Sequence, residues 1–265
     1  MRRFDADYLE STRRGMWEEV GALADLELDS RTRIADVGCG TGELTRVLDR
    51  ESPAAVVGID ADRDLLKTVR EHVPTLAGDA TRLPLIDGAV DLVTCQALLI
   101  NLSEPRLAVE EFVRVSADLV CAIEPDNGGV EVESTVEGEA ALARRARERY
   151  IEGVGTDVTL GADGKELFEA AGLSDVRTRR YDHEKTVKAP YDEAALEGAK
   201  RKATGAGIES DRETMLAGDL GSTGFDELRA EWREMGREAI EQMQTGEYER
   251  VERVPFYVTV GRVDP

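Results

Sequence analysis

The sequence Asp36-Val37-Gly38-Cys39-Gly40-Thr41-Gly42 follows a short apolar run that starts at Arg33, and a second apolar run, 54–59, ends in Asp60. Short, partly β-branched apolar runs are typical of strands buried on both faces in a parallel sheet. The glycines permit a sharp turn and a close approach to a ligand, and 43–48 follows as a helix whose amide end faces that ligand. An acid at the end of the next strand, about 20 residues on, is placed to hold a ribose. The stretch therefore predicts a strand, turn, helix and strand that bind a nucleoside-containing cofactor.

The spacing of these glycines separates two cofactors. A nicotinamide site expects G-x-G-x-x-G, whereas Gly38, Gly40 and Gly42 run as G-x-G-x-G after Asp36. This D-x-G-x-G-x-G pattern resembles the class I S-adenosylmethionine-dependent methyltransferases, and the resemblance extends over roughly 31–127. It implies that the turn wraps the methionine part of the cofactor. A nicotinamide-dependent oxidoreductase is the disfavoured alternative.

Two later segments carry the same resemblance. Gly78-Asp79-Ala80, at the end of a predicted strand over 75–78, is similar to the family's adenine-binding loop; the alternative is that Asp79 only caps a turn. Cys95-Gln96-Ala97-Leu98 follows the predicted strand 89–94 and opens onto the cofactor at the point where strand order reverses. The resemblance implies a cofactor-binding set of Asp36, Gly38, Cys39, Gly40, Gly42, Asp60, Ala61, Asp79, Ala80, Gln96, Tyr8 and Trp17.

Tyr8 and Trp17 lie in a predicted N-terminal helix over 5–26, whose apolar residues recur at near-helical spacing. N-terminal helices in similar methyltransferases lie over the cofactor pocket, so either aromatic ring is a candidate to shield the site or to face the sulfonium. The alternative is that both rings only pack the helix onto the domain.

Glu124 and Asp126 are the candidate catalytic residues, at the end of a predicted strand over 118–123. In similar enzymes this strand end faces the substrate, and a carboxylate base needs a partly buried site that raises its pKa. A turn with exposed acids is an equally weighted alternative. No residue stands out as an essential base, which suits an acceptor atom that needs little proton transfer.

The expected architecture is a doubly wound, Rossmann-like α/β fold, with a seven-stranded sheet whose last strand is antiparallel, plus a helical cap. An arginine-rich helix over 136–151 is either a site for an anionic substrate or a solvated, ion-paired face. A glycine-interrupted insertion carries an apolar stripe from Phe225 to Met243, read as cap packing or a dimer contact. The expected segments are an N-terminal helical cover (1–30), a cofactor-binding core (31–127), a helical cap segment (128–163), the rest of the sheet (164–181 and 255–265) and the cap insertion (182–254).

The amino-acid composition indicates the environment to which the protein is adapted. The formal charge is −21, with 55 acids against 34 bases, of which only six are lysine. Such an excess of acids, with arginine preferred to lysine, suits a protein adapted to high salt, where screening removes most self-repulsion. An ordinary acidic cytoplasmic protein is the alternative. The three cysteines have no paired or metal-binding spacing, and neither a signal peptide nor a membrane span is expected, which favours the cytoplasm and no metal.

These features predict a methyltransferase that uses S-adenosylmethionine, yields S-adenosylhomocysteine and acts on a small-molecule acceptor, as a monomer or homodimer. The D/N-P-P-Y/F signature of nucleic-acid amino methyltransferases is missing after the fourth strand, and the negative charge opposes phosphate-backbone binding. A non-catalytic, cofactor-binding regulatory protein or subunit is the alternative from another class. Methylation of RNA with a partner subunit that supplies a basic surface is a further one.

Overall fold

The computed structural model describes residues 16–17 and 20–264. The chain divides into two compact units: the first comprises 1–126, 160–181 and 256–265, and the second 127–159 and 182–255. Strands β7 (Ser174–Val187) and β8 (Arg250–Arg262) each contribute residues to both units.

The first unit is built on a sheet in the order β3-β2-β1-β4-β5-β8. Its five parallel strands are β1 (Arg33–Val37), β2 (Ala55–Asp60), β3 (Thr75–Ala77), β4 (Val90–Gln96) and β5 (Ser116–Pro125). β8 pairs antiparallel with β5, and β7 pairs with β8. Strand order reverses between β1 and β4, which places the carboxyl ends of these strands at the switch point where ligands bind in open α/β sheets.

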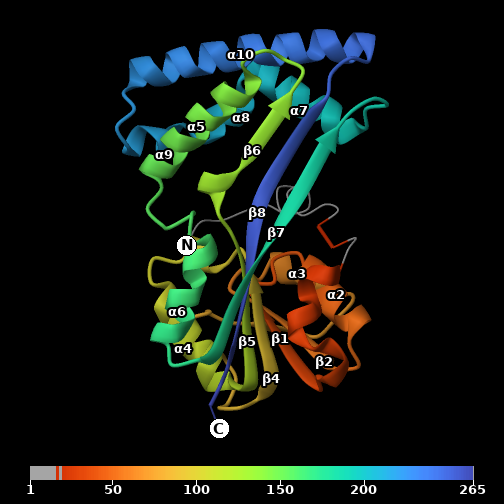
Figure 1. Cartoon of the computed structure of the whole chain (residues 1–265), viewed down its shortest axis with the longest axis vertical. Coiled ribbons are helices and arrows are strands. Elements are labelled where there is room, and N and C mark those ends of the chain that lie inside the picture. Colours follow the sequence, from red (N-terminus) through yellow and green to blue (C-terminus); the bar gives the residue numbers. More distant parts are fainter. Residues whose placement is uncertain (1–15, 18–19, 265) are drawn as a thin grey trace. The chain divides into compact units, whose positions relative to one another are not determined.

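Helices cover this sheet on both faces, with α2 (Glu43–Glu51) and α3 (Leu65–Val69) on one side and α4 (Pro105–Val115) and α6 (Gly164–Ala170) on the other (Figure 1). Each helix has one apolar face; in α4, for example, Ala108, Val109, Phe112 and Val115 are buried. The central strands are buried on both faces, which explains why they read as continuous apolar runs.

The second unit contains β6 (Glu131–Ser134), which pairs with the 250–253 part of β8, and five helices. These are α5 (Glu139–Gly153), α7 (Glu193–Thr204), α8 (Ala206–Ser210), α9 (Arg212–Ala217) and α10 (Ser222–Thr245). The apolar stripe of α10 is buried within this unit, where Phe225, Leu228, Met235, Ala239 and Met243 join one core. Gly236 lies against α7 so closely that a Cβ there would come 2.3 Å from the Ala203 nitrogen.

The doubly wound α/β sheet with an antiparallel last strand is confirmed, but the described residues form eight strands where seven were expected. The additional strand, β6, lies in a segment expected to be helical. β7 also continues to Val187 and β8 begins at Arg250, although both outer parts were assigned to a helical insertion. Charged residues dominate these parts, so their strand pairing leaves no apolar alternation to detect.

The N-terminal helix is only partly within the described residues. Within the predicted helical segment 5–26, Val20–Leu26 forms a 3₁₀ helix, and Leu28–Ser30 forms another. Tyr8 lies outside the described residues. Among the helices that the structure describes, none has the length and apolar character needed to span a membrane.

Candidate cofactor site

The glycine turn after β1 has the backbone conformation that its sequence predicts. Gly38, Gly40 and Gly42 have φ of 71°, 55° and 84°, in the left-handed region that residues with a Cβ rarely adopt. The amides of Gly38 and Cys39 both donate to the Ile59 carbonyl, at 2.7 and 3.1 Å. The turn is therefore anchored to the end of β2, and the amino end of α2 follows it directly.

Neighbouring side chains leave no room for a Cβ at two of the glycines in this turn. A Cβ on Gly38 would come 2.8 Å from the Leu98 side chain, and one on Gly42 would come 2.9 Å from Val69. Leu98 belongs to the segment after β4, so the turn and that segment are in direct contact. A side chain at either glycine would push these elements apart.

Asp36 is buried and connects β1 to α2. Its carboxylate accepts a hydrogen bond of 2.5 Å from the Thr45 hydroxyl, and only 1% of the aspartate is exposed. This bond fixes the helix that follows the turn. Contact between Asp36 and the cofactor stays a prediction.

Asp60, at the carboxyl end of β2, accepts backbone hydrogen bonds with both carboxylate oxygens. Oδ2 accepts from the Gly40 amide and Oδ1 from the Asp62 amide, each at 2.8 Å. Each oxygen has further lone pairs, and the side chain is half-buried, so hydroxyl donors can still approach. Asp60 thus links the glycine turn to the strand end where the sequence places a ribose; the adjacent Ala61 is exposed.

Asp79 and Ala80 follow β3, the neighbour of β2. Oδ1 of Asp79 accepts from the amide and the hydroxyl of Thr81, both at 2.8 Å, so Asp79 does cap its own turn. Among the described residues no donor reaches its other oxygen, and the side chain is exposed. Ala80 is buried. The turn-capping role and an adenine-binding role are therefore compatible, because they use different oxygens.

Gln96 ends β4 and is buried, and its Nε2 donates to the Met16 sulfur at 2.9 Å. Ala97 has a φ of 48°, unusual for a residue with a Cβ, and its amide donates to the Ile123 carbonyl. Trp17 is also buried, and its indole N–H has no hydrogen-bond partner among the described residues. The Met16 contact thus brings the N-terminal segment to the end of β4, and a role of Trp17 at the cofactor stays a prediction.

Glu124 holds the segment after β4. Its Oε1 accepts from the amides of Leu98 and Leu99 at 3.0 and 2.9 Å, and Oε2 from Ile100 at 3.4 Å. Burial raises the pKa of this carboxyl to about 7, although the backbone hydrogen bonds oppose the rise. Since Leu98 packs on the Gly38 turn, Glu124 positions a wall of the cofactor site. A further role as a base stays a prediction.

Asp126 lies two residues beyond Glu124 and is half-buried. A Cβ on Gly161 would come 2.8 Å from the Asp126 Cβ, so this glycine admits a close contact beside the acid. A role for Asp126 in orienting or deprotonating the acceptor stays a prediction.

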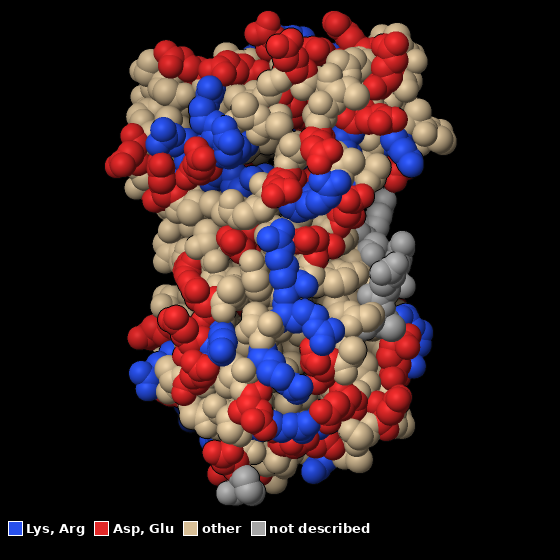
Figure 2. All heavy atoms as spheres, in the orientation of Figure 1, with Lys and Arg blue, Asp and Glu red and all other residues tan. Residues whose placement is uncertain are grey.

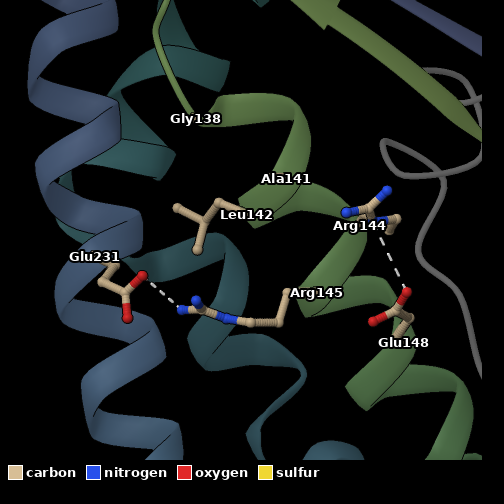
Figure 3. A pocket seen from close by; sticks show the side chains of 7 residues that line it. All are labelled: Gly138, Ala141, Leu142, Arg144, Arg145, Glu148 and Glu231. Carbon is tan, nitrogen blue, oxygen red and sulfur yellow. Dashed lines mark ion pairs between the residues drawn. The ribbon is translucent and has the colours of Figure 1, made fainter.

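The arginine-rich helix, α5, forms one wall of a hollow of about 560 Å³ in the second unit (Figure 3). Arg145 pairs with Glu231 of α10 at 2.6 Å, and Arg144 reaches Glu148 at 3.9 Å. The arginines that line this hollow already have carboxylate partners. The geometry favours the ion-paired interpretation of this face over an anionic substrate site.

Three sets of contacts at the candidate site were not predicted from the sequence: those made by the Met16 sulfur, by the Thr45 hydroxyl and by the amides of Leu98–Ile100. Thr45 had a detectable signal, because a hydroxyl nine residues after a buried aspartate lies on the first turns of the following helix. The Glu124 contacts had none, since strands β4 and β5 are joined by a long connection and their register becomes known only when they pair.

Residues 35–118 match the family described as "Methyltransferase domain". A demethylmenaquinone methyltransferase of Lactiplantibacillus plantarum is 34% identical over 113 residues, 37% of this chain and 48% of that protein. A trans-aconitate 2-methyltransferase of Rhodopseudomonas palustris is 45% identical over 53 residues, 20% of this chain and 21% of that protein. The chain thus spans about half, or less, of the length of these curated relatives.

A solved structure with the same fold is a putative methyltransferase from Bacillus halodurans, with a TM-score of 0.55 and 14% identity, over 94% of this chain and all of that one. The matched residues 35–118 contain the glycine turn, Asp60, Asp79 and the end of β4. Residues 35–118, about a third of the chain, thus match a methyltransferase domain, in agreement with the resemblance of this segment to the class I S-adenosylmethionine-dependent methyltransferases.

Proposed function

We propose that the whole protein transfers a methyl group from S-adenosylmethionine to a small-molecule acceptor. The observation that carries the proposal is the glycine turn, anchored to Ile59 and Asp60, with Asp79 at the end of the neighbouring strand. Its glycines leave no Cβ between the backbone and a ligand, and two carboxylates at adjacent strand ends suit the donor groups of adenosine.

The residues of the chain then have separate tasks. Asp60 accepts hydrogen bonds from the ribose hydroxyls, Asp79 from the adenine amine, and the Gly38–Gly42 turn surrounds the methionine part. S-adenosylmethionine, when bound, supplies a methyl group on a sulfonium, so the protein has to position the reactants and exclude water. Glu124 acts by fixing the Leu98–Ile100 segment, and Asp126 is the more accessible candidate for orienting the acceptor.

The small-molecule class of the acceptor rests on two supports. The curated relatives, by their names, methylate demethylmenaquinone and trans-aconitate, and the sequence lacks the nucleic-acid amino-methyltransferase signature. Those two acceptors differ in chemistry, so the acceptor atom of this protein is a question for enzymatic screening with labelled cofactor.

The first test is calorimetric titration of the purified protein with S-adenosylmethionine, S-adenosylhomocysteine and NADH. Saturable binding of the first two and none of the third is expected. Asp60→Ala removes charge-assisted hydrogen bonds worth roughly 1.5–3 kcal/mol, so affinity falls about 10- to 150-fold. Asp91→Ala is the matched control: its carboxylate also accepts backbone and hydroxyl hydrogen bonds, from Thr32 and Arg33, but at the amino ends of β1 and β4.

Three other outcomes would contradict parts of the proposal. Binding of NADH alone would mean that the glycine turn serves a nicotinamide cofactor. Equal affinity of Asp60→Ala and wild type would refute the ribose assignment. Tight cofactor binding without methyl transfer to any component of a small-molecule extract would indicate a regulatory protein or subunit.

We also propose that the protein is adapted to high salt in the cytoplasm. Acidic side chains are spread over the face shown in Figure 2, with basic side chains among them, and the formal charge is −21. At molar salt the Debye length is about 3 Å, which screens this repulsion. Unfolding in dilute buffer that molar KCl prevents is the expected result, and a stability indifferent to salt would contradict it.

A further inference from the structure

Four cationic side chains gather inside the second unit around only two carboxylates. The cations come from separate elements: Arg147 from α5, Lys185 from β7, Lys202 from α7 and Arg250 from β8. The carboxylates are Glu139 and Glu252. We call these six residues the cationic cluster.

The two carboxylates are shared among the cations. Arg250 reaches Glu252 at 2.7 Å and Glu139 at 3.2 Å, and Lys202 reaches Glu139 at 2.5 Å. Glu139 also accepts hydrogen bonds from the hydroxyls of Tyr248 and Ser134. Arg250 and Lys202 are therefore neutralised by direct ion pairs.

Lys185 and Arg147 lack such pairs. Both interact electrostatically with Glu252, but among the described residues neither has a carboxylate within 4.0 Å. Arg147 donates one hydrogen bond, of 2.7 Å, to the Val130 carbonyl. Arg147, Lys185 and Lys202 are partly buried, and burial lowers the pKa of each by removing part of the hydration of its charge.

The neighbouring acids do not supply the missing charge. Glu148 is within electrostatic reach of Arg147 but is exposed and lies near Arg144. Glu133 and Glu184 pair with Arg253 instead, and neither is among the charges that act on Lys185 or Arg147. The cluster therefore keeps two positive charges in excess, inside a chain whose net charge is −21. Partly buried charges are costly unless an opposite charge compensates them.

We infer that the cationic cluster is a binding site for a small dianion, a phosphate group or a dicarboxylate, with Lys185 and Arg147 as its principal ligands. The side chains of Arg250 and Glu252 are 15% and 23% exposed, so water and a small anion can reach the cluster. Two excess charges match a dianion, and a guanidinium beside an ammonium is a donor set suited to oxyanions. The inference concerns the second unit alone and does not depend on the proposed methyltransferase activity.

The test is calorimetric titration of the full chain with inorganic phosphate and, separately, with succinate, at a constant ionic strength at which the fluorescence of Trp232 shows that the second unit is folded. Saturable binding of at least one dianion is expected, while chloride and acetate bind far more weakly. Which dianion binds more tightly distinguishes a phosphate ligand from a carboxylate ligand. An absence of saturable binding for both would overturn the inference.

Variants separate a ligand site from a purely structural network. Lys185→Gln and Arg147→Gln should each weaken dianion binding about tenfold or more, since each removes a charge-assisted contact. Arg147→Lys should retain much of the affinity. The matched controls are Lys188→Gln, just after β7, and Arg145→Gln, in α5. Each removes an exposed cation outside the cationic cluster and should leave dianion affinity unchanged.

Glu252→Gln makes the sharpest distinction. It removes a negative charge that competes with the ligand, so dianion affinity should rise several-fold, whereas damage to the fold would lower it. Without dianion, Lys185→Gln should unfold at a temperature no lower than wild type, because it relieves repulsion, yet it should lose the dianion-dependent stabilisation. Unchanged affinity in both Lys185→Gln and Arg147→Gln would overturn the assignment of these residues.

Discussion

Among the residues that the structure describes, each unit has one buried glutamate, and the two are stabilised by different means. Glu124 in the first unit is 2% exposed and accepts hydrogen bonds from three backbone amides. Glu139 in the second unit is 1% exposed and is surrounded by Lys202, Arg250 and two hydroxyl groups. Burial raises the pKa of Glu124 to about 7, whereas the pKa of Glu139 is lowered.

The difference shows what a partner's charge contributes. Burial is the largest influence on both carboxyls and raises both pKa values. Neutral amide dipoles offset only part of that cost for Glu124, but full positive charges more than offset it for Glu139. Neutral donors therefore position Glu124 in the first unit, whereas positive charges hold Glu139 as an ion in the second unit.

The signs for stability are opposite. Because the pKa of Glu124 is raised, its contribution to folding stability is fully present below about pH 4.5 and is lost as the pH rises through about 7. The lowered pKa of Glu139 means that its contribution is present above the ordinary value of 4.5 and is lost as pH falls through the lowered value.

The largest effect is expected at Glu139. Glu139→Ala leaves Lys202 and Arg250 buried without a carboxylate between them, and breaking such a pair costs about 3–5 kcal/mol. Denaturant unfolding, monitored by the fluorescence of Trp232 in the second unit, measures the loss. The exposed neighbour Glu137→Ala is the control, and a cost below about 1 kcal/mol at Glu139 would show that the cations are solvated rather than dependent on it.

The next effect is a pH dependence at Glu124. A change of pKa from 4.5 to about 7 corresponds to about 3 kcal/mol, and Glu124→Gln cannot ionise. The stability of Glu124→Gln relative to wild type should therefore rise by up to that amount between pH 5 and about 8, as urea unfolding at several pH values would measure. Glu139→Gln should show the opposite slope in the acid range, and parallel profiles for the two variants would refute the contrast.

A smaller effect is expected for the hydrogen bond that the Thr45 hydroxyl donates to Asp36, on either side of the glycine turn in sequence. Thr45→Val deletes the hydroxyl that donates to buried Asp36, and a hydrogen bond to a charged group contributes about 1.5–3 kcal/mol. Thermal unfolding measures this cost, and cofactor titration should show a parallel loss of affinity as α2 shifts. Thr45→Ser keeps the hydroxyl and should behave like wild type; equal damage from both variants would point to packing instead.

The smallest effect is expected for the exposed ion pair of Arg144 and Glu148 on α5. Both side chains are well exposed, at 72% and 60%, and 3.9 Å apart, and surface pairs contribute about 0–1 kcal/mol. Arg144→Gln should change the unfolding free energy by less than about 0.5 kcal/mol. A larger loss would mean that the hollow beside α5 has a structural role that its exposed charges do not suggest.

The parts of the fold that were predictable share a local origin. Gly38, Gly40 and Gly42 must have an unusual φ at three fixed positions, and Asp60 follows a buried strand at a regular distance. Strand order then follows from the preference for right-handed crossovers. Short-range constraints of this kind can be detected in a single sequence, and they predicted the α/β sheet, with the glycine turn and Asp60 at the carboxyl ends of its strands.

The remaining features depend on pairing between distant segments. Nothing near Glu124 in the sequence shows that it will meet the amides of 98–100, since that contact requires β4 and β5 to pair in one register. The charged continuations of β7 and β8 are strands because they pair with each other, with no local preference to indicate it.

The cationic cluster is the clearest example of this limit. Its members come from residues 139, 147, 185, 202, 250 and 252, each of which is an ordinary charged residue among many in the chain. The sequence by itself determined a cofactor-binding α/β domain, because glycine conformation and strand burial are local demands. Only the tertiary structure decided which charges are buried together, because electrostatic compensation depends on distances that folding alone sets.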